Sequence, residues 1–530
     1  MPDILTRIAL FLALGLQLAC VWQTLRHALH MYQQNSYQNP SYLKWMVENR
    51  KPLFVWRRQL PMLCCIAGIT LGSLWSLCLS TLGAGLFLYF NRQPKAAKKP
   101  LVYTARIKRL MTTAAILTLP LFATGYVWTA AGPSAYSAVS AFVLWTWMLS
   151  QDWLVMLYAA INNPMEKAIN ARYVRGARAI LRSSPQLTVI GITGSYGKTS
   201  TKTYLEQLLS VQYNVYSTPG NFNTTLGVVR AVREGLRPVH QVFLCEMGAR
   251  HRGDIAEICE LARPAMGILT AIGPQHLETF GSQQAITETK LELARAVEAA
   301  GGRMFVNWGS EIAAAQAYNG PLCRYGTADG SDYRVIDITV SGQGSAFTVT
   351  APGGDSARFE TRLLGDANVE NITGAIAVAH SMGISMNRLI PAVRGLKGAP
   401  HRLELKQAGD LTLIDDAYNS NPSGARNALM TLSRCAGSRI VITPGLVELG
   451  TAEEPENRAL GALAAQTADY VVVVGQRPGG FVAAGAEQAG IAAQKLHRAA
   501  TIEEALAHVR ALPLPDKIVL LLNDLPDHYS

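Results

Sequence analysis

A short glycine-rich loop that ends in lysine and threonine is the part of the sequence best suited to chemistry. It is the stretch GITGSYGKTS, residues 191–200. In the usual phosphate-binding loop four residues separate the two glycines. Here Gly194 and Gly197 are separated only by Ser195 and Tyr196. The backbone N–H groups of these four residues are the donors that we expect to contact the phosphates of a nucleotide.

The segments on either side of the loop support this interpretation. Residues 187–193 are apolar and β-branched, and residues 198–210 carry apolar side chains at helical spacing. A strand, a glycine loop and a helix N-terminus together bind a polyphosphate. Lys198 would then contact the β- and γ-phosphates, and Thr199 would bind Mg²⁺. A chance turn is the alternative, and the strand and helix around the loop make it the weaker one.

Three further residues with suitable chemistry follow the loop. Glu246 stands near the end of the apolar run QVFLCEMGAR, where a carboxylate beside a phosphate loop is a usual Mg²⁺ ligand. His276 follows the next apolar run, residues 265–273, and Lys290 lies on an amphipathic helix predicted at 285–297. Each residue also has an ordinary interpretation, as a solvated glutamate, a structural histidine or a surface lysine.

Four motifs in combination resemble the Mur ligases. They are TGSYGKT, EMGARHRGDI, HLETFGS and DDAYNSNP, and the resemblance covers about residues 170–525. It is closest to those members that add D-alanyl-D-alanine, and the short loop is the form this family uses. The resemblance implies that ATP phosphorylates a carboxylate and that an amine then attacks the acyl phosphate. It therefore implies ATP and Mg²⁺ as cofactors and a carbon–nitrogen ligase as the activity.

The resemblance also implies roles for individual residues around the reacting phosphate. Lys198 and Thr199 match the family's phosphate lysine and Mg²⁺ threonine. Glu246 and His276 match the ligands of a first and a second Mg²⁺. Lys290 falls where related ligases carry a lysine carbamylated by CO₂, and a carbamate is an anion that could help bind the second Mg²⁺.

Residues for the nucleoside and the substrates follow from the same resemblance. Asn307, Asn368 and Asn371 match asparagines near the adenine, although Ala367 stands where the family usually has histidine. Arg402 matches an arginine that reaches the phosphates and acts in catalysis with Lys198, and Asp416 would contact the ribose or metal-bound water. Two polar segments would line the acceptor cleft, with the expected contact residues Asn221, Asn223, Thr224, Tyr418, Asn419 and Asn421.

The first third of the chain predicts a membrane domain. Long apolar runs occupy residues 8–31, 60–90, 110–131 and 135–161, each long enough to cross a bilayer. By the positive-inside rule, the basic gaps place the following domains in the cytoplasm, on a multi-pass protein of the inner (cytoplasmic) membrane. Residues 60–90 form either one helix or a glycine-broken hairpin. Buried core helices are the alternative to the membrane domain.

The sequence thus predicts an α-helical membrane domain followed by an α/β ligase. The boundaries are 1–168 for the membrane helices, 169–398 for a central P-loop ATP-binding domain with a parallel-sheet core, and 399–530 for a Rossmann-like domain. The family's usual uridine-binding domain is replaced by the apolar segments, and the last residues, NDLPDHYS, are acidic rather than basic. Both departures leave the acceptor open.

Composition excludes some partners. The formal net charge is +11, and the eight cysteines form no C-x-x-C pair, which disfavours a zinc site. Because the basic residues flank the apolar runs, membrane lipids are a better expected partner than nucleic acid. The other expected partners are ATP, an amino acid or dipeptide amine donor, and a carboxylate-bearing envelope precursor, including a lipid-linked one. A poly-γ-glutamate-type ligase and a membrane ATPase or transporter are the alternatives.

Overall fold

The computed structural model contains two compact units. It describes residues 4–48, 73–90, 100–130, 142–143, 145–273, 277–309, 318–341, 344–417, 421–447 and 449–523. One unit lies within Met1–Ala171 and the other within Arg172–Leu525. The three domain boundaries drawn from the sequence stay predictions.

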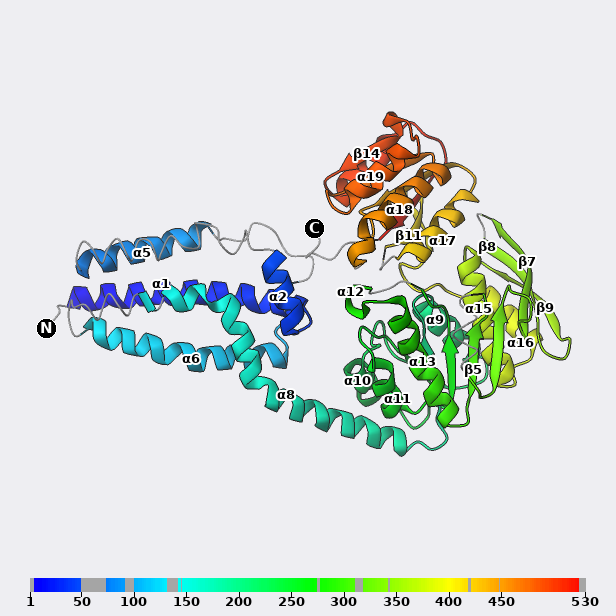
Figure 1. The fold of residues 1–530 in the computed structure, drawn as a ribbon, viewed down its shortest axis with the longest axis horizontal. Helices are drawn as coiled ribbons and strands as arrows, with labels where there is room; N and C mark the ends of the chain where they lie inside the picture. The colour runs from blue at the N-terminus through cyan, green and yellow to red at the C-terminus, as the bar shows by residue number, and fades with distance from the viewer. Residues whose placement is uncertain are drawn as a thin grey trace. The chain divides into compact units, whose positions relative to one another are not determined.

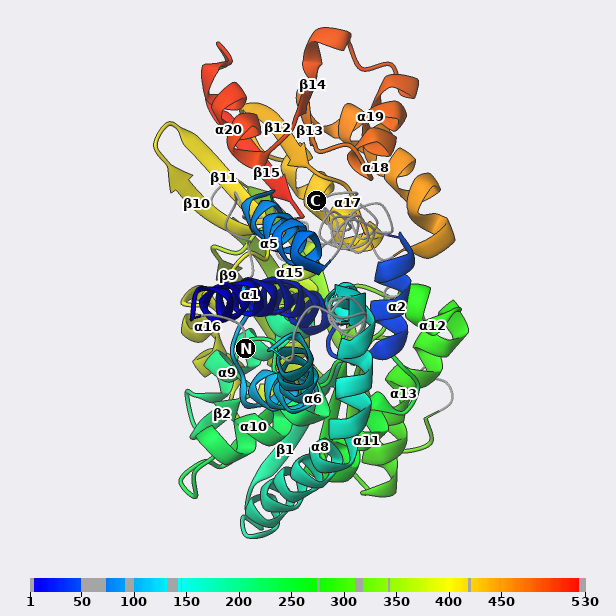
Figure 2. The ribbon, with the colours of Figure 1, turned by 90° about the vertical axis from the view of Figure 1, so that its left-hand side faces the viewer.

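The first unit is helical. Its described helices are α1 (Ile4–Gln34), α2 (Asn39–Glu48), α5 (Ser73–Phe90), α6 (Ala105–Ala130) and the first part of α8 (Gln151–Arg182). Helices α5 and α6 both pack against α1 (Figures 1 and 2). Aromatic side chains form much of the core, where the ring of Tyr32 meets that of Tyr42 edge-on and Tyr158 is fully buried.

The membrane domain predicted from the sequence is wrong. Among the helices that the structure describes, none combines the length and the apolarity needed to cross a membrane. Polar side chains in and next to the apolar runs pair inside the helical unit. Arg109 on α6 donates hydrogen bonds of 2.6 and 2.8 Å to the carboxylate of Glu166 on α8, and Thr113 bonds to Asn162 beside them. The inner-membrane localisation and the lipid partners are therefore withdrawn.

One question about the apolar runs lies partly outside the described residues. Of the run 60–90, residues 60–72 lie outside the described residues, and residues 73–90 form helix α5. The choice between one helix and a hairpin therefore stays a prediction. The fourth run, 135–161, ends within α8, which begins at Gln151 with Asp152 in its first turn. The sequence prediction counted apolar residues and missed these polar helix faces.

The larger sheet of the second unit carries the phosphate loop. Its nine strands have the order β2-β3-β1-β4-β5-β6-β7-β8-β9. Strands β2 to β7 pair in parallel, and β7, β8 and β9 are antiparallel. The bounds are β1 Thr188–Thr193, β2 Val215–Ser217, β3 Val242–Glu246, β4 Met266–Leu269, β5 Arg303–Asn307, β6 Leu322–Gly326, β7 Tyr333–Ser341, β8 Gly344–Thr350 and β9 Ser356–Thr361.

Alternating side chains of the strands build one core on each face of this sheet. Ile190 and Ile192 pack with α9 and α15, whereas Val189 packs with α10, α11 and α13, because neighbouring residues of a strand point to opposite faces. Figure 1 shows α15 and α16 beside the outer strands. The bounds are α9 Lys198–Leu209, α10 Thr225–Gly235, α11 Asp254–Ala262, α12 Leu277–Phe280, α13 Gln283–Ala299, α15 Asp366–Ser381 and α16 Met386–Arg394.

The smaller sheet has six strands in the order β10-β11-β15-β12-β13-β14, of which only the β10–β11 pair is antiparallel. Figure 2 shows this hairpin next to β15. The strands are β10 Glu404–Ala408, β11 Leu411–Asp416, β12 Ser438–Thr443, β13 Tyr470–Val474, β14 Leu496–Ala499 and β15 Lys517–Leu522. The helices are α17 Pro422–Ser433, η1 Gly450–Ala452, α18 Glu453–Thr467, α19 Gly479–Gln488, η2 Ala493–Lys495 and α20 Ile502–Ala511.

The α/β part of the predicted fold is confirmed in this form. Both sheets have a parallel core with helices on both sides, as the Rossmann-like and P-loop predictions required. Each sheet is nevertheless mixed, since an antiparallel hairpin extends it at one edge. The sequence analysis did not anticipate the hairpin of β8 and β9.

Candidate active site

The phosphate loop runs from the end of β1 to the start of α9 and depends on its two glycines. Gly194 and Gly197 have φ angles of 150° and 76°, a region that side-chain-bearing residues rarely adopt. A side chain at Gly197 would also collide with the amide of Asn371 on α15, and one at Gly194 would collide with Thr270 and Ala271 after β4. The loop is therefore held tightly between these neighbours.

Lys198, the first residue of α9, folds back over the loop. Its Nζ donates hydrogen bonds to the carbonyl oxygens of Gly194 (2.6 Å) and Ser195 (3.1 Å). Desolvation lowers the pKa of Lys198 to about 8, while the charge of Glu246 opposes this shift and that of Arg402 adds to it. An ammonium group bound to neutral carbonyls can exchange these contacts for phosphate oxygens without breaking an ion pair.

The predicted metal ligands Thr199 and Glu246 lie together beside the loop. Glu246 ends β3, which pairs with β1, and its Oε1 accepts hydrogen bonds from Thr199 Oγ1 (3.2 Å) and Asn223 Nδ2 (3.1 Å). Burial acts to raise the pKa of Glu246, but the charge of Lys202 and its contact with the carboxylate hold this pKa below its ordinary value. Lys198 and Asn223 lower it further by smaller amounts. The lowered pKa favours the charged carboxylate, which is the form that binds a metal cation.

Lys202 is a residue of this site that the sequence analysis missed. Its side chain is only 4% exposed, and its Nζ forms an ion pair of 2.9 Å with Glu246 Oε2. It also donates hydrogen bonds to the carbonyl oxygens of Thr218 (2.7 Å) and Gly220 (2.9 Å). The available signal was its position four residues after Lys198, which puts both lysines on one face of the helix.

Lys290 lies on α13 and is buried, with 3% exposure. Within the described part of the chain, no hydrogen bond or ion pair to its Nζ is found. Burial and then the charge of Lys198 lower the pKa of Lys290 well below its ordinary value, against the opposing charges of Asp254 and Glu292. Burial therefore disfavours the charged form of this amine. His276, its expected neighbour, lies outside the described residues.

The predicted nucleoside asparagines occupy two places near the loop. Asn371 lies against Gly197, and its Oδ1 accepts a hydrogen bond from Thr201 (3.2 Å). Asn307, at the end of β5, donates to the carboxylate of Glu370 (3.0 Å), whose pKa burial raises. Glu370 adjoins Asn371 on α15 and was also missed from the sequence.

Asn368 is engaged within the protein. It is buried, its Oδ1 accepts a hydrogen bond from Tyr204 Oη (2.7 Å), and its Nδ2 donates to the carbonyl of Leu364 (2.9 Å). These contacts link α15 to α9, the helix that follows the phosphate loop. Its contact with a nucleotide stays a prediction.

The predicted acceptor residues serve partly as helix caps. Thr224 accepts a hydrogen bond from the backbone N–H of Gly227 (3.3 Å) at the start of α10, and Asn421 accepts one from Gly424 (2.8 Å) at the start of α17. Asn221 is exposed. Tyr418 and Asn419 lie outside the described residues. Of the members of this group that the structure describes, Asn223 alone is hydrogen-bonded to Glu246.

Arg402 precedes β10 of the smaller sheet, and its charge acts on Asp416, the last residue of β11. Asp416 Oδ1 accepts a hydrogen bond from the backbone N–H of Leu403 (3.2 Å). Burial raises the pKa of Asp416 to about 7, with Arg402 and that hydrogen bond opposing the shift and Asp415 adding to it. Arg402 interacts electrostatically with Lys198 as well, so it is close to both parts of the proposed site.

Asp416→Asn is expected to stabilise the ligand-free protein, and more at about pH 8 than at about pH 5. The folded state raises the pKa of this carboxyl from 3.8 to about 7, so it retains a proton that the unfolded chain releases in that window. Stability therefore falls as pH rises between these values, by up to a few kcal/mol, and asparagine removes the loss. Thermal unfolding at both pH values measures it.

The control for this experiment is Asp410→Asn, which changes an exposed aspartate in the turn between β10 and β11. It should alter stability equally at both pH values. A pH-independent effect of Asp416→Asn would contradict the raised pKa of Asp416.

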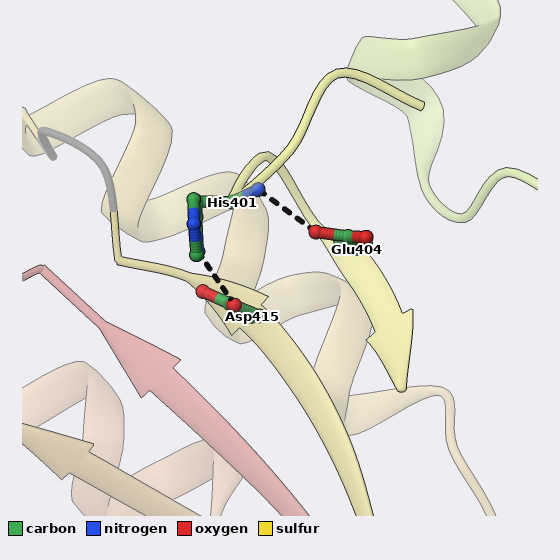
Figure 3. Close-up of side chains that lie close together, drawn as sticks. All are labelled: His401, Glu404 and Asp415. Atoms are coloured by element: carbon green, nitrogen blue, oxygen red, sulfur yellow. Dashed lines mark hydrogen bonds and ion pairs between the residues drawn. The ribbon is translucent and has the colours of Figure 1, made fainter. Parts of the chain in front are cut away.

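His401, which precedes Arg402 in the sequence, belongs to a cluster of possible metal ligands that Figure 3 shows. The ligand atoms of His401, Glu404 and Asp415 all lie within 4.8 Å of one another. Lys406 Nζ already contacts both carboxylates, at 2.9 Å from Glu404 and 2.7 Å from Asp415. His401 Nδ1 is 2.7 Å from Asp415. We interpret the cluster as an ion-pair network that holds the turn carrying Arg402.

These features define the class of protein as a P-loop α/β protein with acidic and basic side chains gathered beside the loop. A family model for the Mur ligase middle domain matches residues 192–379, and one for the Mur ligase glutamate ligase domain matches residues 401–523. The chain belongs to the Mur ligase family. The family recognised from the sequence motifs, one of acid–amino-acid ligases, is thereby confirmed.

Two relatives carry the name UDP-N-acetylmuramoyl-tripeptide–D-alanyl-D-alanine ligase. The one from Bacillus subtilis is 33% identical over 305 residues, 56% of this chain and 65% of the relative. The one from Escherichia coli is 30% identical over 309 residues, 56% of this chain and 67% of the relative. The chain thus spans just under two thirds of the length of the first relative.

A solved structure of MurF from Acinetobacter baumannii has a similar fold. It superposes with a TM-score of 0.59 at 29% identity and covers 66% of this chain and 77% of its own. Both family matches begin after the helical unit, which leaves residues 1–191 outside them.

Proposed function

We propose that this protein is an ATP-dependent amide ligase that joins an amine to a carboxylate through an acyl phosphate. The observation that carries the proposal is the placement of Lys198, Thr199 and Glu246 at one phosphate loop, with Lys290 buried where the charge of Lys198 acts on it. Family membership supports the same reaction. Relatives that carry the name of a D-alanyl-D-alanine ligase are 33% and 30% identical to this chain.

The residues present suit the electrostatic demands of this reaction. A carboxylate and a triphosphate repel each other, so the site must supply positive charge where they meet. Lys198 and Arg402 would supply it from the loop and from the smaller sheet. A hydroxyl and a carboxylate, on Thr199 and Glu246, form the all-oxygen donor set that Mg²⁺ prefers. When bound, Mg²⁺ would add charge neutralisation at the phosphates.

The burial of Lys290 and its lowered pKa support a carbamate at this position. A neutral amine reacts with CO₂ to form a carbamate and release a proton, which converts a cationic side chain into an anionic one. That anion, together with His276, would supply oxygen and nitrogen ligands for the proposed second Mg²⁺. A permanently charged lysine on the surface would not react with CO₂ and would not provide an anionic metal ligand.

The substrates belong to the proposal as well. We propose an amino acid or dipeptide, with D-alanyl-D-alanine the first candidate, as the amine donor, and a carboxylate-bearing precursor of the cell envelope as the acceptor. Peptidoglycan biosynthesis is the corresponding process. The helical unit precedes the residues that the two family models match. The activity test should therefore include acceptors other than a UDP-linked tripeptide.

Release of inorganic phosphate from ATP should require both a carboxylate acceptor and an amine donor. The purified full-length chain is incubated with Mg²⁺ and ATP, with each substrate alone and with both. An ¹⁸O-labelled carboxylate should transfer one labelled oxygen to the released phosphate, because that oxygen attacks the γ-phosphorus and leaves with it. Equal ATP hydrolysis without either substrate would instead indicate an ATPase or transporter, and a γ-glutamyl product would indicate a poly-γ-glutamate-type ligase.

A further inference from the structure

Lys202 joins three segments of the candidate site that are separate in the sequence. It lies on α9, its ammonium contacts Glu246 at the end of β3, and it also bonds to the carbonyl oxygens of Thr218 and Gly220 after β2. The three distances are 2.9, 2.7 and 2.9 Å. With three oxygen partners, the ammonium group has its full set of contacts.

The two carboxylate oxygens of Glu246 have different surroundings. Oε2 faces Lys202, whereas Oε1 accepts hydrogen bonds from Thr199 and Asn223. A cation that binds Glu246 together with the Thr199 hydroxyl must therefore approach Oε1. Because the side chain of Glu246 is 1% exposed, it cannot turn away without leaving the Lys202 charge buried and unpaired.

The segment after β2 is tied to Glu246 a second time, through Asn223. The amide of Asn223 donates to Oε1, and its carbonyl accepts a hydrogen bond of 2.7 Å from Gly248, just beyond β3. A divalent cation at Oε1 would compete with the Asn223 amide for the same oxygen. Lys202 would meanwhile keep its contacts with the two carbonyl groups of the segment. Metal binding would therefore change the contact between Asn223 and Glu246 but leave the contacts of Lys202 in place.

We propose that Lys202 is a positioning residue that holds Glu246 Oε1 toward a divalent cation and couples the metal site to the segment 218–224. This segment includes Asn221, Asn223 and Thr224, which we expect to contact the acceptor. Nucleotide, metal and acceptor would thus be aligned through one buried ammonium group. The inference rests on the proposed function, since it assumes a nucleotide and Mg²⁺ at this loop.

Equilibrium binding of ADP to full-length Lys202→Met tests the proposal. A fluorescent ADP analogue is titrated once with excess Mg²⁺ and once with EDTA. In the wild type, Mg²⁺ should tighten binding. In the variant this gain should fall by about tenfold or more, the scale on which partners of metal ligands act, while binding in EDTA should change little because Lys198 is intact. A purely structural lysine would affect both titrations alike.

Hydrogen–deuterium exchange of the segment 218–227 supplies a second readout. In the wild type, exchange with Mg²⁺ and ADP should differ from exchange with ADP and EDTA. In Lys202→Met that difference should disappear. Lys517→Met is the matched control. Lys517, on β15 of the smaller sheet, is also buried (7% exposed) and also donates to a carbonyl, that of Arg510 on α20, at 2.8 Å. The control should keep the wild-type differences.

The outcomes separate this inference from the proposed function. A wild type with no Mg²⁺-dependent gain would count against the proposed Mg²⁺ site itself. A wild-type gain that persists in Lys202→Met, with unchanged exchange, would overturn only the role of Lys202. If Lys202→Met fails to fold, Lys202→Gln is measured, since glutamine keeps donors for the carbonyls without the charge. A full gain in Lys202→Gln would equally overturn the proposal.

Discussion

Lys198→Ala is expected to abolish ATP-dependent turnover while the protein stays folded. Among the described residues, Lys198 donates hydrogen bonds to the carbonyls of Gly194 and Ser195, and loss of two such hydrogen bonds costs about 1–2 kcal/mol of stability. In the reaction the same charge would stabilise the transferring phosphate. Removing one oriented charge there should raise the barrier by at least ~3 kcal/mol, more than a hundredfold in rate. Phosphate release measures the rate.

Two measurements accompany this variant. Thermal unfolding should show a modest decrease, which confirms that the loss of activity is not a loss of fold. Lys495→Ala, at an exposed lysine of the short helix η2 that precedes β14, should keep wild-type turnover. If Lys198→Ala worked at a rate within a few-fold of the wild type, the phosphates would have to be bound somewhere other than this loop.

The region around the phosphate loop could be predicted because its information is local. A β-branched apolar run, two glycines and a helical pattern adjoin one another in the sequence, and each has one strong conformational preference. The glycines are needed at Gly194 and Gly197 because both have positive φ angles and close neighbours. The strand ending at Glu246 followed from the same kind of pattern, since β3 is buried throughout.

The other contacts around the site join residues that are separated in the sequence. Tyr204 bonds to Asn368, 164 residues away, and this contact joins α9 to α15. Lys202 reaches carbonyl groups 16 and 18 residues beyond it. Neither pairing can be read from spacing or composition, because a lysine or an asparagine has the same local signature whether it is solvated or buried with a partner.

The membrane prediction failed for a related reason. Hydropathy describes each run by itself, whereas the polar residues within α6 and α8 pair across 57 residues, as Arg109 and Glu166 do. Such pairs allow polar side chains to be buried between helices. The apolar runs alone were therefore not sufficient to predict whether lipid or other helices surround each helix of this unit.

Lys290→Ala should reduce ligase activity by at least about a hundredfold, because it would remove the carbamate oxygens proposed to bind the second Mg²⁺. The site favours carbamylation, since burial and the Lys198 charge lower the pKa of Lys290 well below its ordinary value. The neutral amine is the form that reacts with CO₂. Carbamylation should accordingly weaken as the pH falls through that lowered pKa and the amine becomes protonated. With ¹³C-labelled CO₂, the wild type should show a carbamate carbon signal that the variant lacks.

Formate or acetate at high concentration should restore part of the activity of Lys290→Ala. The alanine leaves space where the lysine side chain was, and a small carboxylate can place an anion there in the position of the carbamate. An unmodified lysine is a cation, and an added anion could not replace it. Chloride at equal ionic strength is the control for salt effects, and Lys198→Ala, whose missing group is a cation, should not respond to the carboxylates. Full activity of Lys290→Ala without rescue would remove this residue from the mechanism, and an inactive variant that no carboxylate restores would contradict the carbamate.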